Sequence, residues 1–147
     1  IKVANKDRHV TGKGRFEGQM RSSPNWEYVF TWQKRGEGKP PKKNIQLSRE
    51  EWSEYVDGIW AIKTAKGGMQ HTGGSEVNPF PIEIPRRLIK MFTERGDVVY
   101  DPFMGTGSTI ESACELGREA YGIELMPETF DFACNRLSDF TGIQSKS

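Results

Sequence analysis

The sequence has little cysteine, little histidine and no long apolar run in its 147 residues. Its two cysteines, Cys114 and Cys134, each lie in an apolar helical pattern, which indicates reduced core residues and not a disulfide framework. Its two histidines, His9 and His71, have no companion ligand at metal-binding spacing, so we expect no metal site. A mean hydropathy of -0.68 argues against a transmembrane helix, and the expected location is the cytoplasm.

The charges divide the chain into two halves of opposite sign. Residues 1–70 carry 14 Lys and Arg against 8 Asp and Glu, and residues 71–147 carry 7 against 12. The net charge of +1 therefore joins a +6 half to a -5 half. A basic half can face a polyanion, although a solvated basic surface without a partner has the same composition. We therefore expect the two halves to have different functions.

The acidic half has the periodicity of an alternating α/β layer. Apolar spacing and turn residues predict helices and short strands in alternation, over 84–95, 98–101, 108–116, 120–123 and 127–140. We expect the strand at 98–101 to be buried. Strands that are joined through helices by tight turns pair in parallel, so this half predicts a single α/β layer.

The basic half predicts a small α+β lobe with long loops. Ser48 and Glu51 form a capping-box pattern that opens a short helix. Aromatic and β-branched residues predict strands at 26–32 and 59–62. Glycine, proline and charge predict irregular chain, with at most one short strand near the start, at 1–23, 34–44 and 63–79. Three tryptophans are expected in the core of this lobe, namely Trp26, Trp52 and Trp60.

The turn from Asp101 to Thr109 (DPFMGTGST) joins a predicted strand to a predicted helix. Gly105 and Gly107 allow the backbone to approach a ligand, and the helix start aims N–H groups at the same place. Ligands of open α/β sheets bind at the carboxyl ends of strands, where this turn lies. Asp101 can pair there with a ligand amine, and Glu124 stands 23 residues further on, where a ribose diol requires an acid.

Glycine turns between a strand and a helix bind several classes of ligand in proteins, and the residues of this turn distinguish among them. A phosphate-binding P-loop ends in Gly-Lys-Ser/Thr, and this turn has no lysine. A dinucleotide-binding fold has a third glycine where Ile110 stands. The ligand that remains is a nucleoside with an amino-acid end, S-adenosyl-L-methionine, and the alternative is a tight turn that binds nothing.

These residues resemble the cofactor motifs of a known enzyme family. Asp101–Thr109 is similar to the glycine motif of the amino-group DNA methyltransferases, which methylate N6 of adenine or N4 of cytosine, and Tyr121–Leu125 (YGIEL) resembles the next motif. Asn78–Pro81 (NPFP) resembles the segment over the methionine end of the cofactor, and this order matches the permuted β class. The resemblance implies S-adenosyl-L-methionine as cofactor, bound by Phe80, Pro81, Asp101, Pro102, Phe103, Gly105, Thr106, Gly107, Ser108, Thr109, Glu124 and Leu125.

The family transfers the methyl group with an Asp/Asn/Ser-Pro-Pro-aromatic tetrapeptide, and this sequence has none. In the permuted class the tetrapeptide precedes the recognition region, and the first residue here is Ile1, not methionine. We therefore expect the cofactor-binding and recognition portion of a methyltransferase, inactive alone, with its catalytic portion upstream or on another chain. The alternatives are a non-catalytic cofactor-binding subunit, or a portion of an RNA or small-molecule methyltransferase.

The resemblance implies a partial Rossmann-like methyltransferase sheet over 71–147 and a basic α+β target-recognition lobe over 1–70. It does not choose between adenine N6 and cytosine N4. Double-stranded DNA is the expected partner, in a restriction-modification setting, with the target base flipped from the duplex. The candidates for DNA contact are basic residues of the lobe, namely Arg15, Arg21, Lys34, Arg35, Lys39, Lys42 and Lys43.

Overall fold

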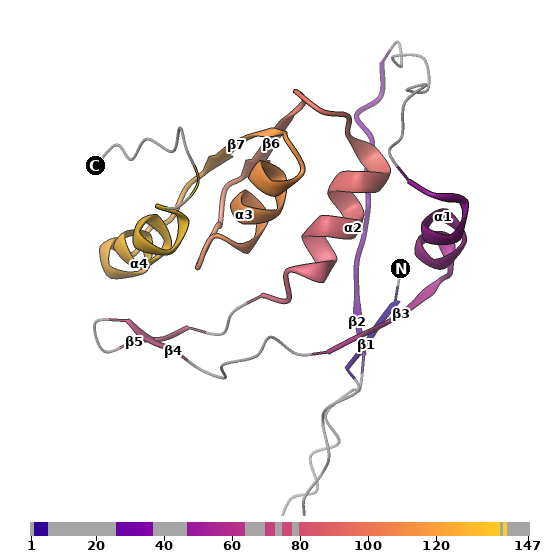
Figure 1. Cartoon of the computed structure of the whole chain (residues 1–147). Coiled ribbons are helices and arrows are strands. Elements are labelled where there is room, and N and C mark those ends of the chain that lie inside the picture. The colour runs from indigo at the N-terminus through magenta and orange to yellow at the C-terminus, as the bar shows by residue number, and fades with distance from the viewer. Residues whose placement is uncertain are drawn as a thin grey trace, which may run out of the picture.

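The computed structural model describes residues 2–5, 26–36, 47–63, 70–72, 75–77, 80–138 and 140. Within these ranges no helix is long and apolar enough to cross a membrane. The fold is α/β, and the alternation predicted for the acidic half is confirmed. The elements are β1 (Lys2–Asn5), β2 (Trp26–Tyr28), α1 (Arg49–Val56), β3 (Ile59–Ile62), β4 (Gln70–Thr72), β5 (Ser75–Val77), α2 (Glu83–Phe92), β6 (Val98–Asp101), α3 (Ser108–Glu115), β7 (Glu119–Gly122) and α4 (Pro127–Leu137) (Figure 1).

Strands β6 and β7 form the predicted parallel pair, with Asp101 opposite Gly122 at its carboxyl end. Helix α3 connects the two strands and packs against both of them (Figure 1). The prediction that β6 is buried was wrong, because helices cover only one face of the pair and the side chains of β6 alternate between half-buried and exposed. Large apolar side chains lie on and beside the open face, each more than half exposed: Val98, Tyr100, Tyr121 and Ile123.

The basic half forms a second sheet with the strand order β2-β1-β3. Strand β1 pairs antiparallel with β2 and parallel with β3, so the stretch at 1–23 supplies the central strand. The strand predicted at 26–32 ends at Tyr28, while the strand predicted at 59–62 is confirmed. The partners of β1 lie more than 20 residues away along the chain, and so no local pattern revealed its central place.

The glycine-rich connection at 63–79, predicted as irregular, contains a short hairpin. Strand β4 pairs antiparallel with β5, with Gln70 opposite Val77 and Thr72 opposite Ser75. These strands are only three residues long and mostly polar, so the sequence carried no alternation from which to predict them.

Helix α1 begins with the predicted capping box. The Ser48 Oγ accepts a 3.1 Å hydrogen bond from the Glu51 N–H, and the Glu51 carboxylate accepts one of 3.1 Å from the Ser48 N–H. Two backbone N–H groups of the first turn, which have no partner inside the helix, are thereby satisfied. The cap fixes where the helix starts, at Arg49, six residues before its buried Tyr55.

Trp60, at 1% exposure, is the centre of the first hydrophobic core. The Trp60 core also contains Tyr55, Ile62 and Ile84, and the indole N–H of Trp60 donates a 3.0 Å hydrogen bond to the Tyr55 carbonyl. Trp52 is exposed, so the prediction of a core position was wrong for it. The side chain of the third tryptophan, Trp26, lies outside the described part.

Helix α2 joins the two halves of the chain. Its Ile84 is buried in the Trp60 core, Leu88 and Met91 pack against that core, and the helix also packs against α3. The basic half therefore shares its core with a helix of the acidic half, and the division into 1–70 and 71–147 stays a prediction.

The second hydrophobic core lies beneath the glycine turn. The Met104 core consists of Met104, Ile110, Ala133 and Leu137, which come from the turn, α3 and α4. The two cysteines, which the sequence predicts as reduced core residues, are free, and they are half-buried. Burial raises the pKa of both thiols above the usual value, so they stay protonated at neutral pH.

Candidate functional site

The turn between β6 and α3 starts at Asp101, the last residue of β6. The Asp101 carboxylate accepts a 3.0 Å hydrogen bond from the Phe103 N–H, and the Asp101 carbonyl accepts one of 3.0 Å from the Ile123 N–H. The Met104 N–H donates in turn to the Ile123 carbonyl at 2.9 Å. Bonding between the two strands therefore continues past their ends and holds the start of the turn beside the end of β7.

The two glycines of the turn have different roles. Gly105 has φ +53°, and a Cβ built there would meet no atom within 4 Å, so the space above it is open to a ligand. Gly107 has φ +83°, and a Cβ there would lie 2.8 Å from Cδ1 of Leu137 in α4. Both conformations favour glycine. Gly105 keeps the site open, whereas Gly107 allows α4 to pack against the turn.

Glu124 follows β7 and reaches back to the glycine turn. Its Oε2 accepts a 3.1 Å hydrogen bond from the Gly105 N–H, and its Oε1 accepts one of 2.9 Å from the Met126 N–H. The two hydrogen bonds fix the orientation of the carboxylate, because each of its oxygens has its own donor. The acid predicted to meet a ribose therefore lies directly beside the turn.

A pocket of about 300 Å³ lies over the turn, at the lower end of the size range of small-molecule sites. Phe103 is 88% exposed and Phe80 is about half exposed, so both rings can move against a ligand. All the lining residues except Met104 are among those that the sequence predicts, and they are Phe80, Asp101, Phe103, Met104, Gly105, Thr106, Ser108 and Thr109.

The other predicted cofactor residues do not line this pocket. Glu124 bonds to Gly105, and Gly107 lies against α4. Pro81 is half-buried at the start of α2, where its carbonyl accepts a 3.1 Å hydrogen bond from the Ile84 N–H. The last two, Pro102 and Leu125, are exposed.

Of the predicted DNA contacts, the structure describes Lys34 and Arg35, which are both exposed in the segment after β2. The remaining five lie outside the described residues: Arg15, Arg21, Lys39, Lys42 and Lys43. Within the described ranges, no three side chains of His, Cys, Asp or Glu gather in a group that could hold a metal ion.

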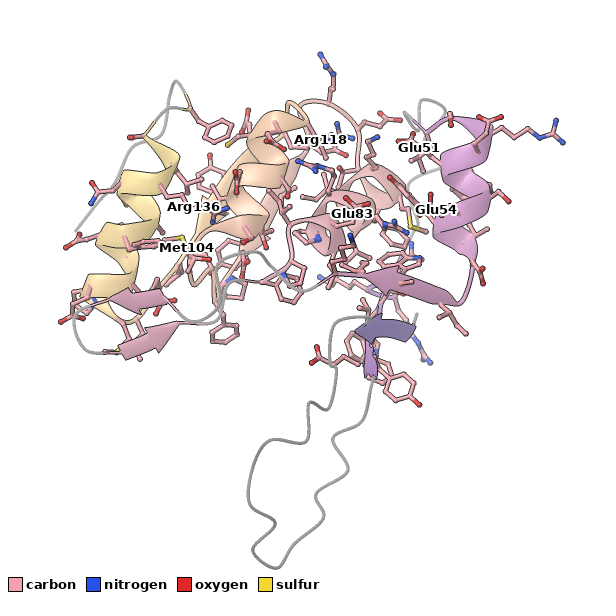
Figure 2. The ribbon with its side chains drawn as sticks, turned by 60° about the horizontal axis from the view of Figure 1, so that its bottom comes forward. Glu51, Glu54, Glu83, Met104, Arg118 and Arg136 are labelled. Carbon is pink, nitrogen blue, oxygen red and sulfur yellow. The ribbon has the colours of Figure 1, made fainter. Side chains whose placement is uncertain are left out.

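Three residues that shape the site were missed at the level of sequence. Met104 lines the pocket, and a Cβ on Gly122 would lie 2.4 Å from its Sδ. Arg136 of α4 donates from Nη1 to the Thr106 carbonyl at 2.6 Å, and Figure 2 shows its side chain between α4 and α3. A glycine inside a strand is a recognised sign of close packing, so Gly122 could have been found. Arg136 could not, because its contact is 30 residues away and leaves no local pattern.

Comparison with known proteins places this arrangement in a family. The family model of the N6/N4 methyltransferases, described as DNA methylase, matches residues 3–135. The Type II methyltransferase M.MjaI of Methanocaldococcus jannaschii is 34% identical over 140 residues, which cover 84% of this chain and 42% of that protein. The Type II methyltransferase M.BglI of Bacillus subtilis is 33% identical over 116 residues, which cover 78% and 31%.

A solved structure agrees with the family match. TTHA0409 of Thermus thermophilus, a proposed DNA modification methylase complexed with S-adenosyl-L-methionine, is 29% identical with a TM-score of 0.71. The structural likeness covers 97% of this chain and 54% of the Thermus protein. The chain spans less than half the length of each of the two Type II methyltransferases. Because the family model matches most of the chain, this protein belongs to the N6/N4 DNA methylase family.

Proposed function

We propose that this chain is the S-adenosyl-L-methionine-binding and DNA-recognition portion of a DNA methyltransferase. The observation that carries the proposal is the open turn at Gly105. The turn lines the pocket together with Asp101, and the Glu124 carboxylate accepts a hydrogen bond from its Gly105 N–H. The relatives are Type II methyltransferases, and the Thermus neighbour was solved with this cofactor. The target is an exocyclic amine, N6 of adenine or N4 of cytosine, on a base flipped from the duplex.

The chemistry of the residues in the pocket and of the neighbouring Glu124 fits this cofactor. Asp101 offers a carboxylate to the ammonium group of the methionine end, and Glu124 offers one to the ribose hydroxyls. The first N–H groups of α3, at Ser108 and Thr109, suit the methionine carboxylate because a helix N-terminus carries partial positive charge. The open space above Gly105 leaves room for a ligand to touch the backbone.

The remaining predicted residues have supporting roles in this proposal. Phe80, Phe103 and Leu125 cover apolar faces of the cofactor, and their exposure leaves them free to do so. We assign a role in shaping the backbone of the site to four further residues, namely Pro81, Pro102, Thr106 and Gly107. When bound, the cofactor supplies a methyl group on a sulfonium, which a neutral amine can take without a covalent enzyme intermediate. The task of these residues is to hold that methyl group in one position and direction.

We assign catalysis to a portion of the methyltransferase outside these residues. This assignment follows the motif order of the permuted β class, in which the catalytic tetrapeptide precedes the recognition region. Two exposed apolar surfaces support this assignment. One is the open face of the β6–β7 pair, and the other is a row of stacked rings at Tyr28, Phe30 and Trp32, with centroids 5.9 and 5.6 Å apart. Large exposed apolar patches mark interaction sites, and the relatives are more than twice as long as this chain's match to them. The catalytic portion, upstream or on a second chain, would cover both surfaces.

DNA contact is assigned to a recognition lobe at 1–70, and cofactor binding to 71–147. The exposed Lys34 and Arg35 support the first assignment, because phosphate contacts come from such side chains. In this proposal the basic residues outside the described ranges complete the DNA-facing surface. The free, half-buried cysteines agree with a reducing cytoplasm.

Calorimetric titration of S-adenosyl-L-methionine into the purified chain tests the cofactor assignment. We expect Glu124→Ala to weaken binding by about tenfold or more, because the variant loses a ribose acceptor and the hydrogen bond that the Gly105 N–H of the turn donates to it. Glu119→Ala, at an exposed carboxylate of β7, is the control and leaves affinity unchanged. A wild-type chain that does not bind the cofactor would overturn the proposal.

Two further measurements test the DNA assignments. The chain alone is expected to transfer no methyl group to duplex DNA, and transfer would show that the catalytic groups lie within it. Fluorescence anisotropy with duplex DNA and RNA at two salt concentrations tests the lobe, where Lys34→Glu with Arg35→Glu should weaken DNA binding and lower its salt dependence. Tighter binding to RNA than to duplex DNA would reject DNA as the substrate.

A further inference from the structure

The last turn of α4 lies against the backbone of the glycine turn. Leu137 occupies the space beside Gly107, and the neighbouring Arg136 donates from Nη1 to the Thr106 carbonyl at 2.6 Å. The other guanidinium nitrogen of Arg136, Nη2, pairs with Glu111 of α3. One side chain thus connects three elements, namely α4, the turn and the helix that starts at the turn (Figure 2).

The contact falls on a peptide unit that decides the shape of the pocket. Thr106 lines the pocket, and its carbonyl belongs to the same peptide plane as the Gly107 N–H. That N–H donates to the Met104 carbonyl at 2.8 Å, while Arg136 holds the carbonyl on the opposite side. The plane is therefore held at both ends. Its orientation determines where the next backbone N–H groups, those of Ser108 and Thr109 at the pocket wall, are directed.

We propose that Arg136 is a positioning residue of the cofactor site, which sets the conformation of the glycine turn from outside the pocket. Arg136 is not among the pocket residues and touches no ligand in this scheme. It acts through the Thr106 carbonyl, and Glu111 keeps its guanidinium in place. The inference rests on the proposed function for its ligand, S-adenosyl-L-methionine. The conformational part of the inference can be tested without that ligand.

The chain contains a matched control for this role. Arg86 of α2 pairs with Glu115, which is also on α3, and its side chain is 33% exposed against 31% for Arg136. Both pairs attach α3 to a neighbouring helix. Only the Arg136 pair also reaches the turn, so a difference between Arg136→Met and Arg86→Met isolates the contact with Thr106.

Amide hydrogen exchange of the full chain, without ligand, is the first test. We expect Arg136→Met to speed exchange in the peptide that covers 104–110 by about tenfold, because one charge-assisted hydrogen bond no longer resists local opening. Arg86→Met should leave that peptide unchanged at a similar unfolding midpoint. Equal exchange of the turn in the two variants would overturn the inference.

Titration with S-adenosyl-L-methionine is the second test. Arg136→Met should weaken affinity by about tenfold, Arg136→Lys should recover part of the loss because it keeps one donor for the carbonyl, and Arg86→Met should match the wild type. Full affinity in Arg136→Met would overturn the inference. Absence of binding by the wild-type chain would instead overturn the proposed function, and hydrogen exchange would still decide the role of Arg136.

Discussion

The two hydrophobic cores of this protein are built in opposite ways. In the Trp60 core, the rings of Tyr55 and Trp60 meet edge to face with centroids 6.4 Å apart, so large side chains fill the space. The Met104 core instead contains the fully buried Ala133, and Gly107 beside it brings the backbone of the turn against α4. The comparison teaches that the core beneath the site depends on close backbone approach, whereas the core remote from it depends on aromatic bulk.

Charge is placed differently in the two regions as well. Arg87 is buried, and its guanidinium carbon lies 4.7 Å from the Tyr55 ring centroid. It pairs with Glu54 at 2.6 Å and with Glu83 at 2.8 Å. Burial lowers the pKa of Arg87, but its hydrogen bonds to the two carboxylates outweigh burial, so the pKa lies above its usual value. Arg136 is more exposed and holds a turn rather than a core. Arg87 thus joins α1 to α2, whereas Arg136 joins α4 to the glycine turn and to α3.

The largest expected effect is on the aromatic core. Trp60→Ala should lower the free energy of unfolding by about 3–5 kcal/mol, because it leaves a cavity in place of an aromatic ring that is only 1% exposed. Trp60→Phe keeps a ring in that space and should cost clearly less. Urea denaturation followed by circular dichroism measures both. A loss below about 1 kcal/mol for the alanine variant would show that this core does not depend on bulk.

Gly107→Ala tests the opposite principle in the Met104 core. We expect a loss of about 3 kcal/mol in the free energy of unfolding, since left-handed strain adds to a clash with Leu137. Gly117→Ala is the matched control, because it has φ +73° but its nearest atom, Cγ of Arg95, lies 3.6 Å away. The control should lose only the strain, about 1–2 kcal/mol. Equal losses of unfolding free energy in the two variants would show that the close packing of Leu137 against Gly107 does not contribute to stability.

Gly105→Ala should separate ligand binding from stability. The new Cβ meets no protein atom, so the free energy of unfolding falls only by the conformational strain, about 1–2 kcal/mol. Affinity for S-adenosyl-L-methionine should fall much further, because the Cβ enters the pocket. Gly96→Ala, at φ +79° with open space around it and away from the pocket, should cost the same stability and no affinity. If the two variants bind equally well, the ligand does not approach Gly105.

The smallest effect concerns the ion pairs around the Trp60 core. Hydrogen bonds from Lys90 and from the Ser48 backbone lower the pKa of Glu51 below its usual 4.5. A lowered pKa in the folded state means that the Glu51 carboxylate stabilises the fold fully above pH 4.5 and loses that contribution as the pH falls through the lowered value. Glu51→Gln should therefore flatten the acid side of a plot of unfolding midpoint against pH. The exposed neighbour Glu50→Gln is the control, and identical plots for the two variants would contradict the prediction.

Local patterns were sufficient to predict the elements that position the site. The periodicity of α2, α3 and α4, the short strands between them and the capping box of α1 are properties of neighbouring residues, and so is the glycine turn. Seven of the eight residues that line the pocket are among those that the family resemblance implies as cofactor-binding. What the sequence could not assign was the difference between Gly105 and Gly107, since only the packing of α4 distinguishes them.

The features that the sequence did not predict depend on partners distant along the chain. The central place of β1 requires β3, and the early end of the predicted strand at 26–32 reflects pairing that stops at Tyr28. The exposure of Val98 and Tyr100 on β6 contradicts an apolar run that is typical of a buried strand. An apolar strand of this kind predicts that both faces of its sheet are covered. In the described part of the chain, helices cover only one face of the β6–β7 pair.

Gly122 contributes no atom to the lining of the pocket, yet it leaves the room in which the Met104 side chain of the pocket wall lies. A Cβ there would lie 2.4 Å from Sδ of Met104 and 3.0 Å from Cδ1 of Ile110, so any side chain displaces the thioether that forms part of the pocket wall. Methionine is the side chain that yields most easily to such pressure. The position of one wall of this pocket therefore depends on a residue of the neighbouring strand β7, which is not itself part of the lining.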